Sequence, residues 1–284
     1  MSTRQEIDEA VAIALEAGQT ALGYFQQSGI RTDVKPDDSL LSEADASTEE
    51  LIINRLQKSF PGQPVIGEET ISEQDVGHFE NALNSASAWV VDPIDGTNNF
   101  VAGDPTWCVS IARLNHGRPE LGVIYFPALG DQLYFNEGET LHTKRLATSP
   151  DSQLEAIPPA LPDEYPARLF MAHDSFYLRF KFRQRHVPRI SGCTVINLLY
   201  VVLGKAIAAA TSAHLWDFAA PLAFAPPKNI QMAAIFSERA YDRFTPDDLH
   251  LTPENPKRAW KVKEECIVAP APLIDELRDS ITTV

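Results

Sequence analysis

The chain has 284 residues, of which 44% are hydrophobic and 22% are charged, and its formal net charge is −15. This length supports one large domain or two modest domains with their own cores, and the composition excludes a disordered or fibrous protein. The negative charge argues against binding to a nucleic-acid backbone or to an anionic membrane surface, so neither a nucleic acid polymer nor a membrane is an expected partner.

The cysteines and the N-terminal residues bear on the cellular compartment. Cys108, Cys193 and Cys266 are few and far apart, which predicts neither a disulfide framework nor a structural zinc site. The N-terminus lacks the basic stretch and apolar core of a signal peptide, and no apolar run is long enough to cross a bilayer. These features predict a cytoplasmic protein.

The first half of the chain combines helical patterns with short apolar strands. Apolar residues at helical spacing predict helices over residues 4–27 and 44–60. An amphipathic membrane helix would carry Lys and Arg on its polar face, whereas the first helix carries acidic residues there. Strands are predicted at residues 64–67, 89–91, 107–114, 121–126 and 131–135. Turn signals join the last three strands, which indicates an antiparallel meander.

The second half alternates strands with helices after a segment rich in Pro, Ser and Asp. This segment, residues 148–166, is the predicted linker between an α+β domain of residues 1–147 and an α/β domain of residues 167–284. Strands are predicted at residues 168–172, 188–190, 205–210, 230–236 and 261–268. Helices are predicted at residues 175–185 and 194–203, from about Asp217 onward, and at residues 273–281.

The most informative stretch is WVVDPIDGTNNF at residues 89–100. A buried strand leads into a tight turn with two carboxylates, Asp92 and Asp95. Pro93 ends the strand ladder, and Gly96 permits an unusual backbone conformation at the start of a helix, whose unpaired N–H groups favour an anion. Carboxylates beside an anion site suit magnesium, which shares its oxygen ligands with phosphate. The alternative is an ordinary surface turn, because these residue types are common turn formers.

Three further carboxylates stand where predicted elements begin or end. Glu68 follows the strand at residues 64–67, Asp217 precedes a small apolar helix start, and Asp45 lies near the start of the second helix. An exposed acidic turn is the alternative for Glu68, and a helix N-cap is the alternative for Asp217. A capping carboxylate can also face a cation.

Together these stretches resemble a known family. GEE at residues 67–69, DPIDGT at 92–97, and WD at 216–217 with AA at 219–220 are similar to the three motifs of the inositol monophosphatase family, in the same order. This family belongs to the lithium-sensitive, magnesium-dependent phosphatases, with fructose-1,6-bisphosphatase and 3′-phosphoadenosine 5′-phosphate phosphatases. The resemblance implies a layered αβαβα sandwich of the sugar-phosphatase type, two or three Mg²⁺ ions and a homodimer.

The resemblance also implies roles for individual residues. The metal ligands would be Glu68, Asp92, the carbonyl of Ile94, Asp95 and Asp217. The catalytic residues would be Asp45, Thr97 and Glu68, with Asp45 and Thr97 orienting the attacking water. The positions that meet the substrate would be Asp95, Gly96, Thr97, Gly192, Cys193, Thr194 and Ala210. Lys35 falls near a basic position that the family places close to the metals.

The chain departs from the family pattern on the substrate side. Ala210 stands seven residues before Asp217, where inositol-directed members carry a glutamate that binds ring hydroxyls. The family's Gly-x-Gly-Ala-x-x-Asn-Gly stretch and its later paired glycines are replaced by NEGETL at residues 136–141 and APPKN at 225–229. Cys193 replaces the usual Ser or Thr. These departures predict an intact metal site with a changed substrate pocket.

The expected protein is a phosphoric monoester hydrolase that acts on a small phosphorylated metabolite by two-metal activation of water, as inositol monophosphatases do. The loss of a carboxylate at Ala210 removes a contact of roughly 1–3 kcal/mol. A sugar (bis)phosphate or 3′-phosphoadenosine 5′-phosphate is therefore an alternative substrate. A second alternative is a non-catalytic relative that binds a ligand or partner, because function must be argued from the site and not from the fold.

Overall fold

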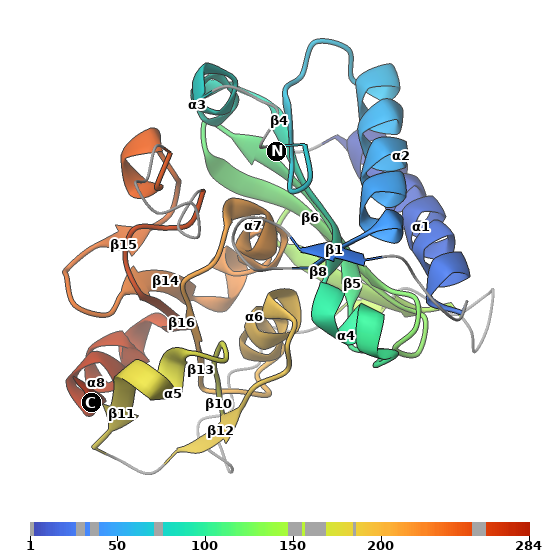
Figure 1. The fold of residues 1–284 in the computed structure, drawn as a ribbon. Helices are drawn as coiled ribbons and strands as arrows, with labels where there is room; N and C mark the ends of the chain where they lie inside the picture. Colours follow the sequence, from blue (N-terminus) through green and yellow to red (C-terminus); the bar gives the residue numbers. More distant parts are fainter. Residues whose placement is uncertain are drawn as a thin grey trace.

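The structure is a computed structural model, and it describes residues 3–26, 32–34, 40–70, 76–146, 155–156, 169–183, 186–251 and 260–284. Two large β-sheets alternate with layers of helices (Figure 1). Helices α1 (Arg4–Phe25) and α2 (Glu43–Ser59) cover the outer face of the first sheet. Helices α6 (Thr194–Val202) and α7 (Leu215–Ala223) lie between the sheets, and α5 (Phe176–Arg179) and α8 (Ile274–Ser280) lie beyond the second sheet. This arrangement confirms the expected αβαβα sandwich.

The first sheet begins with a parallel pair and continues as an antiparallel meander. Its strands, in spatial order, are β3 (Val65–Gly67), β4 (Ala88–Asp95), β5 (Cys108–Asn115), β6 (Arg118–Phe126), β7 (Gln132–Glu137), β8 (Thr140–Arg145) and β9 (Glu155–Ala156). The predicted meander is thereby confirmed. It also extends further than expected, because Gly138, with a φ of 58°, turns the chain from β7 into β8.

The second sheet is mixed. Its spatial order is β12 (Val187–Arg189), β10 (Leu169–Met171), β13 (Ala208–Thr211), β16 (Cys266–Pro270), β14 (Ile230–Ala234) and β15 (Ala240–Tyr241). The first three strands are parallel, and the neighbours from β13 onward are antiparallel. The parallel part places the residues that follow β10 and β13 at the same edge of the sheet.

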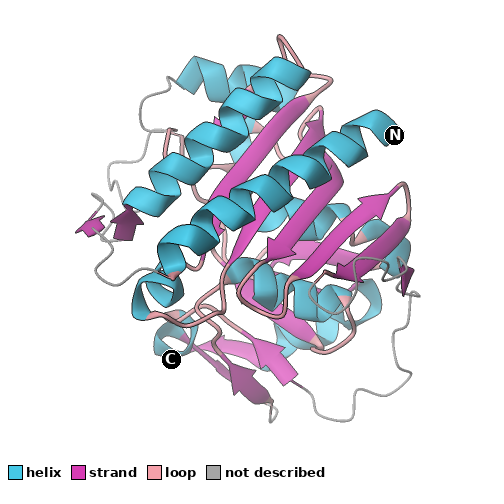
Figure 2. Ribbon diagram, turned by 90° about the vertical axis from the view of Figure 1, so that its right-hand side faces the viewer, coloured by secondary structure: helices cyan, strands magenta, loops and turns pink. Residues whose placement is uncertain are grey.

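The long helices of the first half begin with matched caps. In α1 (Arg4–Phe25) the side chains of Thr3 and Glu6 bond to each other's backbone N–H groups, and in α2 (Glu43–Ser59) Ser42 and Asp45 do the same. The two helices run side by side across the first sheet (Figure 2). The other described helices are α3 (Val76–Asn84), α4 (Thr97–Ala102), α5 (Phe176–Arg179), α6 (Thr194–Val202), α7 (Leu215–Ala223) and α8 (Ile274–Ser280).

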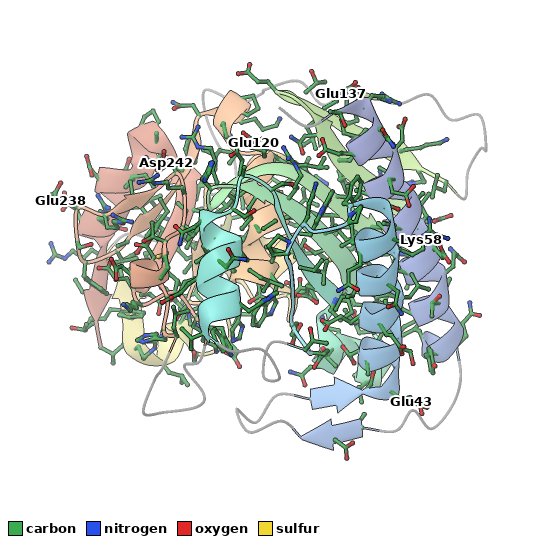
Figure 3. All side chains as sticks on the ribbon, turned by 90° about the horizontal axis from the view of Figure 1, so that it is seen from above. Glu43, Lys58, Glu120, Glu137, Glu238 and Asp242 are labelled. Atoms are coloured by element: carbon green, nitrogen blue, oxygen red, sulfur yellow. The ribbon has the colours of Figure 1, made fainter. Side chains whose placement is uncertain are left out.

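Apolar side chains fill the spaces between these layers (Figure 3). One cluster joins α1 and α2 to the first sheet, and a second joins both sheets to α6 and α7. A third lies on the outer face of the second sheet and includes Phe176, Ala210 and Ile267. The labelled Glu43 and Glu238 lie toward opposite ends of the molecule in Figure 3. Buried apolar contacts therefore connect the helices and sheets of neighbouring layers.

The predicted helix at residues 175–185 is wrong beyond Arg179. The chain becomes extended at Phe180 and forms β11 (Phe180–Phe182), which pairs with β17 (Ile281–Thr283). The alternation of Phe180, exposed Lys181 and Phe182 suits a strand whose alternate side chains face the core. Helix α5 is therefore only four residues long.

Other boundaries differ because of local backbone hydrogen bonds. The strand predicted at residues 205–210 begins only at Ala208, since the N–H groups of Lys205 and Ala206 both donate to Tyr200 O at the end of α6. The strand predicted at residues 261–268 begins at Cys266, and Lys261 makes only an isolated bridge with His214. Helix α3 was missed because its apolar pattern is short.

The predicted linker at residues 148–166 lies mostly outside the described residues. The described part, Glu155–Ala156, forms the edge strand β9 and pairs with β8. The short pair β1 (Thr32–Val34) and β2 (Leu40–Ser42) precedes α2. The division into two domains stays a prediction.

Candidate metal centre

A bulge at the end of β4 brings Asp92 and Asp95 to the same side of the sheet. Residues three apart in a regular strand point to opposite faces. Here Asp92 pairs with Ser110 and Asp95 pairs with Cys108, so three steps on β4 match two steps on β5. Ile94 N–H turns inward and donates to Asp92 Oδ1 at 3.1 Å. The local irregularity therefore makes the two carboxylates converge.

Helix α7 supplies a third carboxylate from the other side. The oxygens of Asp92, Asp95 and Asp217 include a set that lies within 4.8 Å of one another. Asp217 is in the first turn of α7, where its Oδ2 accepts the N–H of His214 at 2.8 Å. Asp217 is therefore not the N-cap that was the predicted alternative: His214 is the N-cap, and the Asp217 carboxylate bonds back to it while lying beside Asp92 and Asp95.

The electrostatics of this cluster are unfavourable without a cation. Burial, together with the charges of Glu68, Asp95 and Asp217, raises the pKa of Asp92 well above its ordinary value. Burial and the charge of Asp217 raise the pKa of Asp95 to about 7. Asp92 Oδ2 is buried and has no hydrogen-bond donor among the described residues. Since hard oxygen ligands and uncompensated negative charge suit a divalent cation, the donor set fits magnesium.

Glu68 follows β3 and enters the site beside β4. Its N–H donates to Val91 O at 3.2 Å, which continues the parallel pairing of β3 with β4. The buried Glu49 of α2 fixes the next residues by accepting the N–H groups of Glu69 and Thr70 at 2.9 and 2.8 Å. The Glu49 carboxylate therefore sets the path of the loop that carries Glu68.

Thr97 and Asp45 lie together next to the end of β4. Gly96 has a φ of 99°, and α4 begins directly after it. Thr97 Oγ1 lies 3.2 Å from Asp45 Oδ1 and 3.2 Å from Ile94 O, so its single proton can be donated to either acceptor. Asp45 is fully buried, and its other oxygen accepts hydrogen bonds from Ser42.

Asp95 also caps helix α6. Its carboxylate accepts the N–H groups of Thr194 at 3.1 Å and Val195 at 2.7 Å, and the thiol of Cys193 at 2.7 Å. Cys193 is only 1% exposed, so its thiol faces Asp95 and not the cavity. Gly96 is close to Cys193, because a Cβ at Gly96 would lie 3.3 Å from Cys193 Cβ and 2.9 Å from Thr106 O.

A cavity of about 350 Å³ opens between these elements. One wall is formed by residues of the first sheet and α4, and the other by the segments after β10 and β13 and by the start of α7. Its lining includes Glu68, Asp95, Gly96, Thr97, Asn98, His173, Asp174, Ser175, Arg179, Gly192, Thr194, Asn197, Ala210, Thr211, Ser212, Ala213, His214, Asp217 and Lys261. The lining therefore combines acidic side chains with the basic side chains of Arg179 and Lys261.

The structure gathers most of the predicted site residues at this cavity. Thr97 joins Asp45 to the turn after β4, while Gly192, Thr194 and Ala210 line the cavity. Ala210 is only 2% exposed and belongs to the cluster on the outer face of the second sheet. Lys35 lies outside the described residues.

Sequence reasoning missed several residues around the cavity. His214 is not among the predicted site residues, yet its ring stacks on Trp216 at 4.5 Å and its Nδ1 lies 3.3 Å from Asp217 Oδ2. The spacing of His214 and Asp217, three residues apart at a helix start, was an available signal. His173, Arg179 and Glu265 were missed because they are far apart in the sequence.

Comparisons with known proteins agree with this fold and site. Inositol monophosphatase 2 of Solanum lycopersicum is 33% identical over 205 residues, which cover 70% of this chain and 75% of that protein. Histidinol-phosphatase of Chlorobaculum parvum is 36% identical over 44% of this chain and 46% of its own length. Fructose-1,6-bisphosphatase/inositol-1-monophosphatase of Thermotoga maritima is 30% identical over 64% of this chain and 66% of its own length. The alignments with the last two proteins thus cover less than two thirds of them.

A solved structure and the family's sequence model complete the identification. The Thermotoga maritima IMPase structure superposes with a TM-score of 0.71 at 20% identity, covering 96% of this chain and 95% of that one, which shows a shared fold. The relatives above together with the fold, and not the fold alone, place the protein among the phosphatases that hydrolyse phosphate monoesters. The sequence model of the inositol monophosphatase family matches residues 3–225, and the chain belongs to this family. No helix within the described residues is long and apolar enough to cross a membrane.

Proposed function

We propose that the protein hydrolyses a small phosphate monoester in a magnesium-dependent reaction with water as the nucleophile. The observation that carries this proposal is the convergence of Asp92, Asp95 and Asp217. The burial of Asp92 and Asp95 and their raised pKa values support a role as cation ligands. An exposed acidic turn would have neither property.

The cation ligands in this proposal are Glu68, Asp92, the carbonyl of Ile94, Asp95 and Asp217. When bound, two magnesium ions would lower the pKa of water and neutralise charge on the phosphate. We propose that two magnesium ions bind; the family resemblance also allows a third. Asp95 also holds the start of α6 through the N–H groups of Thr194 and Val195, so a ligand in this position is tied to both walls of the cavity.

Thr97 and Asp45 form the proposed water-orienting pair. Thr97 Oγ1 has two acceptors at 3.2 Å, Asp45 Oδ1 and Ile94 O, which restricts the orientation of its hydroxyl. A lone pair of this oxygen can accept a hydrogen bond from the attacking water. Asp45 is buried and anchored by Ser42, so it can receive the proton that Thr97 relays without leaving its place. The backbone N–H groups of Gly96 and Thr97 are the proposed phosphate contacts.

The substrate is a small phosphorylated metabolite. An inositol monophosphate is the first candidate because of the family and of relatives such as the tomato enzyme. A sugar (bis)phosphate or 3′-phosphoadenosine 5′-phosphate is the second candidate, and Ala210 favours it. The Ala210 methyl group cannot accept a hydrogen bond from a ring hydroxyl, and it is packed in an apolar cluster.

The test is a phosphate-release assay over several dozen monoesters, with magnesium or with a chelator. We expect turnover that requires magnesium, is inhibited by lithium and is lost in Asp92→Asn. Thr97→Val should reduce kcat about 10²-fold or more, while Thr97→Ser should retain most of it. A folded protein that binds a phosphate ester without turning it over would instead indicate the non-catalytic alternative and would overturn the proposal.

The cytoplasmic location and the homodimer belong to the same proposal. Both follow from the composition and the family resemblance. Light scattering of the purified protein tests the dimer, and fractionation of cells that express it tests the location.

A further inference from the structure

At the cavity wall formed by the segment after β10, His173 and Arg179 are hydrogen-bonded to Glu265 in one cluster. His173 Nε2 lies 2.6 Å from Glu265 Oε1, and Arg179 Nη2 donates to Glu265 Oε2 at 2.5 Å. The side chain of Glu265 is only 6% exposed, whereas that of Arg179 is 47% exposed. The buried carboxylate therefore lies behind the cluster, and the guanidinium extends from it toward solvent.

This geometry fixes the two basic side chains at the cavity wall. His173 and Arg179 both line the cavity, and Glu265 does not belong to its lining. His173 Nδ1 lies 3.1 Å from Ser175 Oγ, so both ring nitrogens have partners. The Arg179 guanidinium lies 5.0 Å from the centre of the Phe180 ring, which restrains it further. A guanidinium held in this way loses less conformational entropy on binding an anion than a freely rotating one.

The sheet explains why this cluster lies beside Ala210. Strand β13 runs parallel to β10, which His173 follows, and antiparallel to β16, which Glu265 precedes. Ala210 shares its apolar cluster with Phe176 of α5 and with Phe180. A carboxylate in place of Ala210 would put a negative charge near this part of the cavity. Because Ala210 carries no charge, no carboxylate at this position competes with a substrate anion for Arg179.

Lys261 adds a second cation to the same cavity, where Arg179 is already paired with one carboxylate, that of Glu265. Lys261 lines the cavity and is bridged through its backbone to His214. Asp174 also lines it, but its side chain is 93% exposed, so water and salt screen its charge. Glu265 is engaged by His173 and Arg179. The acidic residues Glu68, Asp95 and Asp217 line the same cavity, and the proposed cations would neutralise them.

We propose that Arg179 and Lys261 form a subsite for a second phosphate group on the leaving group of the substrate. The inference rests on the proposed function, because it concerns the selection of substrate at the same site. The phosphate to be cleaved occupies the proposed cation site, and the second phosphate contacts Arg179 and Lys261. A guanidinium has five N–H donors in a planar fork that matches two phosphate oxygens, which makes Arg179 the principal contact.

The first experiment compares matched substrates with the unmodified protein and magnesium. The pairs are adenosine 3′,5′-bisphosphate against adenosine 3′-monophosphate, and a hexose 1,6-bisphosphate against the corresponding 1-phosphate. We expect kcat/KM to be at least tenfold higher for each bisphosphate, mainly through a lower KM. Equal values within each pair, or a higher value for an ester with a cationic leaving group such as histidinol phosphate, would overturn the subsite.

The second experiment assigns the effect to residues. Arg179→Gln and Lys261→Gln should each lower kcat/KM for the bisphosphate at least tenfold more than for the monophosphate. Arg179→Lys should recover part of the preference because it keeps the charge. The matched control is Arg189→Gln, since Arg189 is exposed on β12 and is not in the described lining of the cavity. Arg189→Gln should leave kcat/KM unchanged for both the bisphosphate and the monophosphate.

The outcomes separate this inference from the proposed function. If no ester is hydrolysed with magnesium present, the proposed function fails. If esters are hydrolysed but the variants affect both members of each pair equally, only the subsite fails. Arg179→Gln leaves Glu265 with one partner fewer, so a thermal melt accompanies each assay, and Lys261→Gln tests the subsite without disturbing that buried carboxylate.

Discussion

The two walls of the cavity differ in how firmly the fold holds their functional groups. On one wall, Asp92 and Asp95 are 1% and 6% exposed and lie at the end of a fully buried strand. On the other wall, Arg179 is 47% exposed and ends a helix of four residues. The buried wall is fixed by strand pairing and helix caps, whereas the second depends on a short segment at the edge of its sheet. If the proposed roles hold, the difference teaches that most of the catalytic groups and the substrate-selecting groups belong to parts of the fold that differ in rigidity.

Asp92→Asn should have the largest effect on activity. It removes a proposed cation ligand, and we expect kcat to fall roughly 10³-fold, as for other groups that stabilise transition-state charge. Burial raises the pKa of Asp92, so the neutral amide should also raise the melting temperature of the metal-free protein. Phosphate release and a thermal melt with chelator check both effects. Asp242→Asn, which changes an exposed carboxylate, is the control. If Asp92→Asn retained activity, the buried wall would not carry the reaction, and the comparison of the two walls would fail.

Glu49→Ala should have the next largest effect, because Glu49 holds the loop that carries Glu68. The change deletes the acceptor of two backbone N–H groups without touching the cavity lining. We expect a loss of about 10- to 100-fold in magnesium affinity or activity, typical of residues that orient metal ligands. A magnesium titration of activity measures it. Glu50→Ala changes the exposed neighbour and should behave as wild type. An unchanged magnesium dependence of Glu49→Ala would mean that the loop needs no such support.

The stability of the metal-free protein should fall as the pH rises. The pKa values of Asp92 and Asp95 are raised in the folded state, that of Asp95 to about 7, so the folded chain binds more protons than the unfolded chain. Their stabilising contribution is complete below about pH 4, the ordinary carboxyl range, and is lost as the pH rises through about 7. Melting temperatures with chelator at pH 5 to 8 check this slope.

Magnesium should reverse that dependence, because it neutralises the same carboxylates. The increase in melting temperature on adding magnesium should therefore grow with pH, and Asp95→Asn should flatten the slope of the metal-free protein. The lowered pKa values of the exposed carboxylates Asp104 and Asp242 act in the opposite direction, but screening keeps their effect small. A metal-free protein that becomes steadily more stable from pH 5 to 8 would contradict the electrostatic account of the site.

Changes at Cys193 should have the smallest effect. Cys193→Ser keeps a hydrogen-bond donor to Asp95, and we expect kcat/KM within about threefold of wild type. Cys193→Val removes the donor and should cost about 1 kcal/mol, or roughly fivefold. Steady-state kinetics with the preferred ester distinguish the two variants. If valine were as active as serine, the thiol contact would have no role in placing Asp95.

Much of the fold could be predicted where local patterns are strong. The first two helices, the meander and the strand before Asp92 have clear periodicity and are confirmed within a few residues. Prediction failed at residues 175–185, because one helical turn followed by an apolar–polar–apolar strand has too little length for either period to dominate. Helix α3 was missed for the same reason.

The sequence by itself determined the acidic turn and its neighbours. Residues 92–97 specify an irregular strand end and a helix start, because proline and glycine restrict the backbone locally. The prediction that Pro93 ends the strand ladder is wrong, since β4 continues through a bulge and pairs again at Asp95. The three motifs, in their order along the chain, also indicate the family without any information on how the carboxylates meet in space.

Only the tertiary structure decided how distant groups meet. Asp95 caps a helix 99 and 100 residues later, and Glu265 pairs with His173 and Arg179 from 92 and 86 residues away. Such contacts depend on strand order and register between segments far apart in the chain, which no local pattern records. For this reason the sequence indicates the reaction, while the proposed second phosphate subsite depends on contacts that only the packed sheets create.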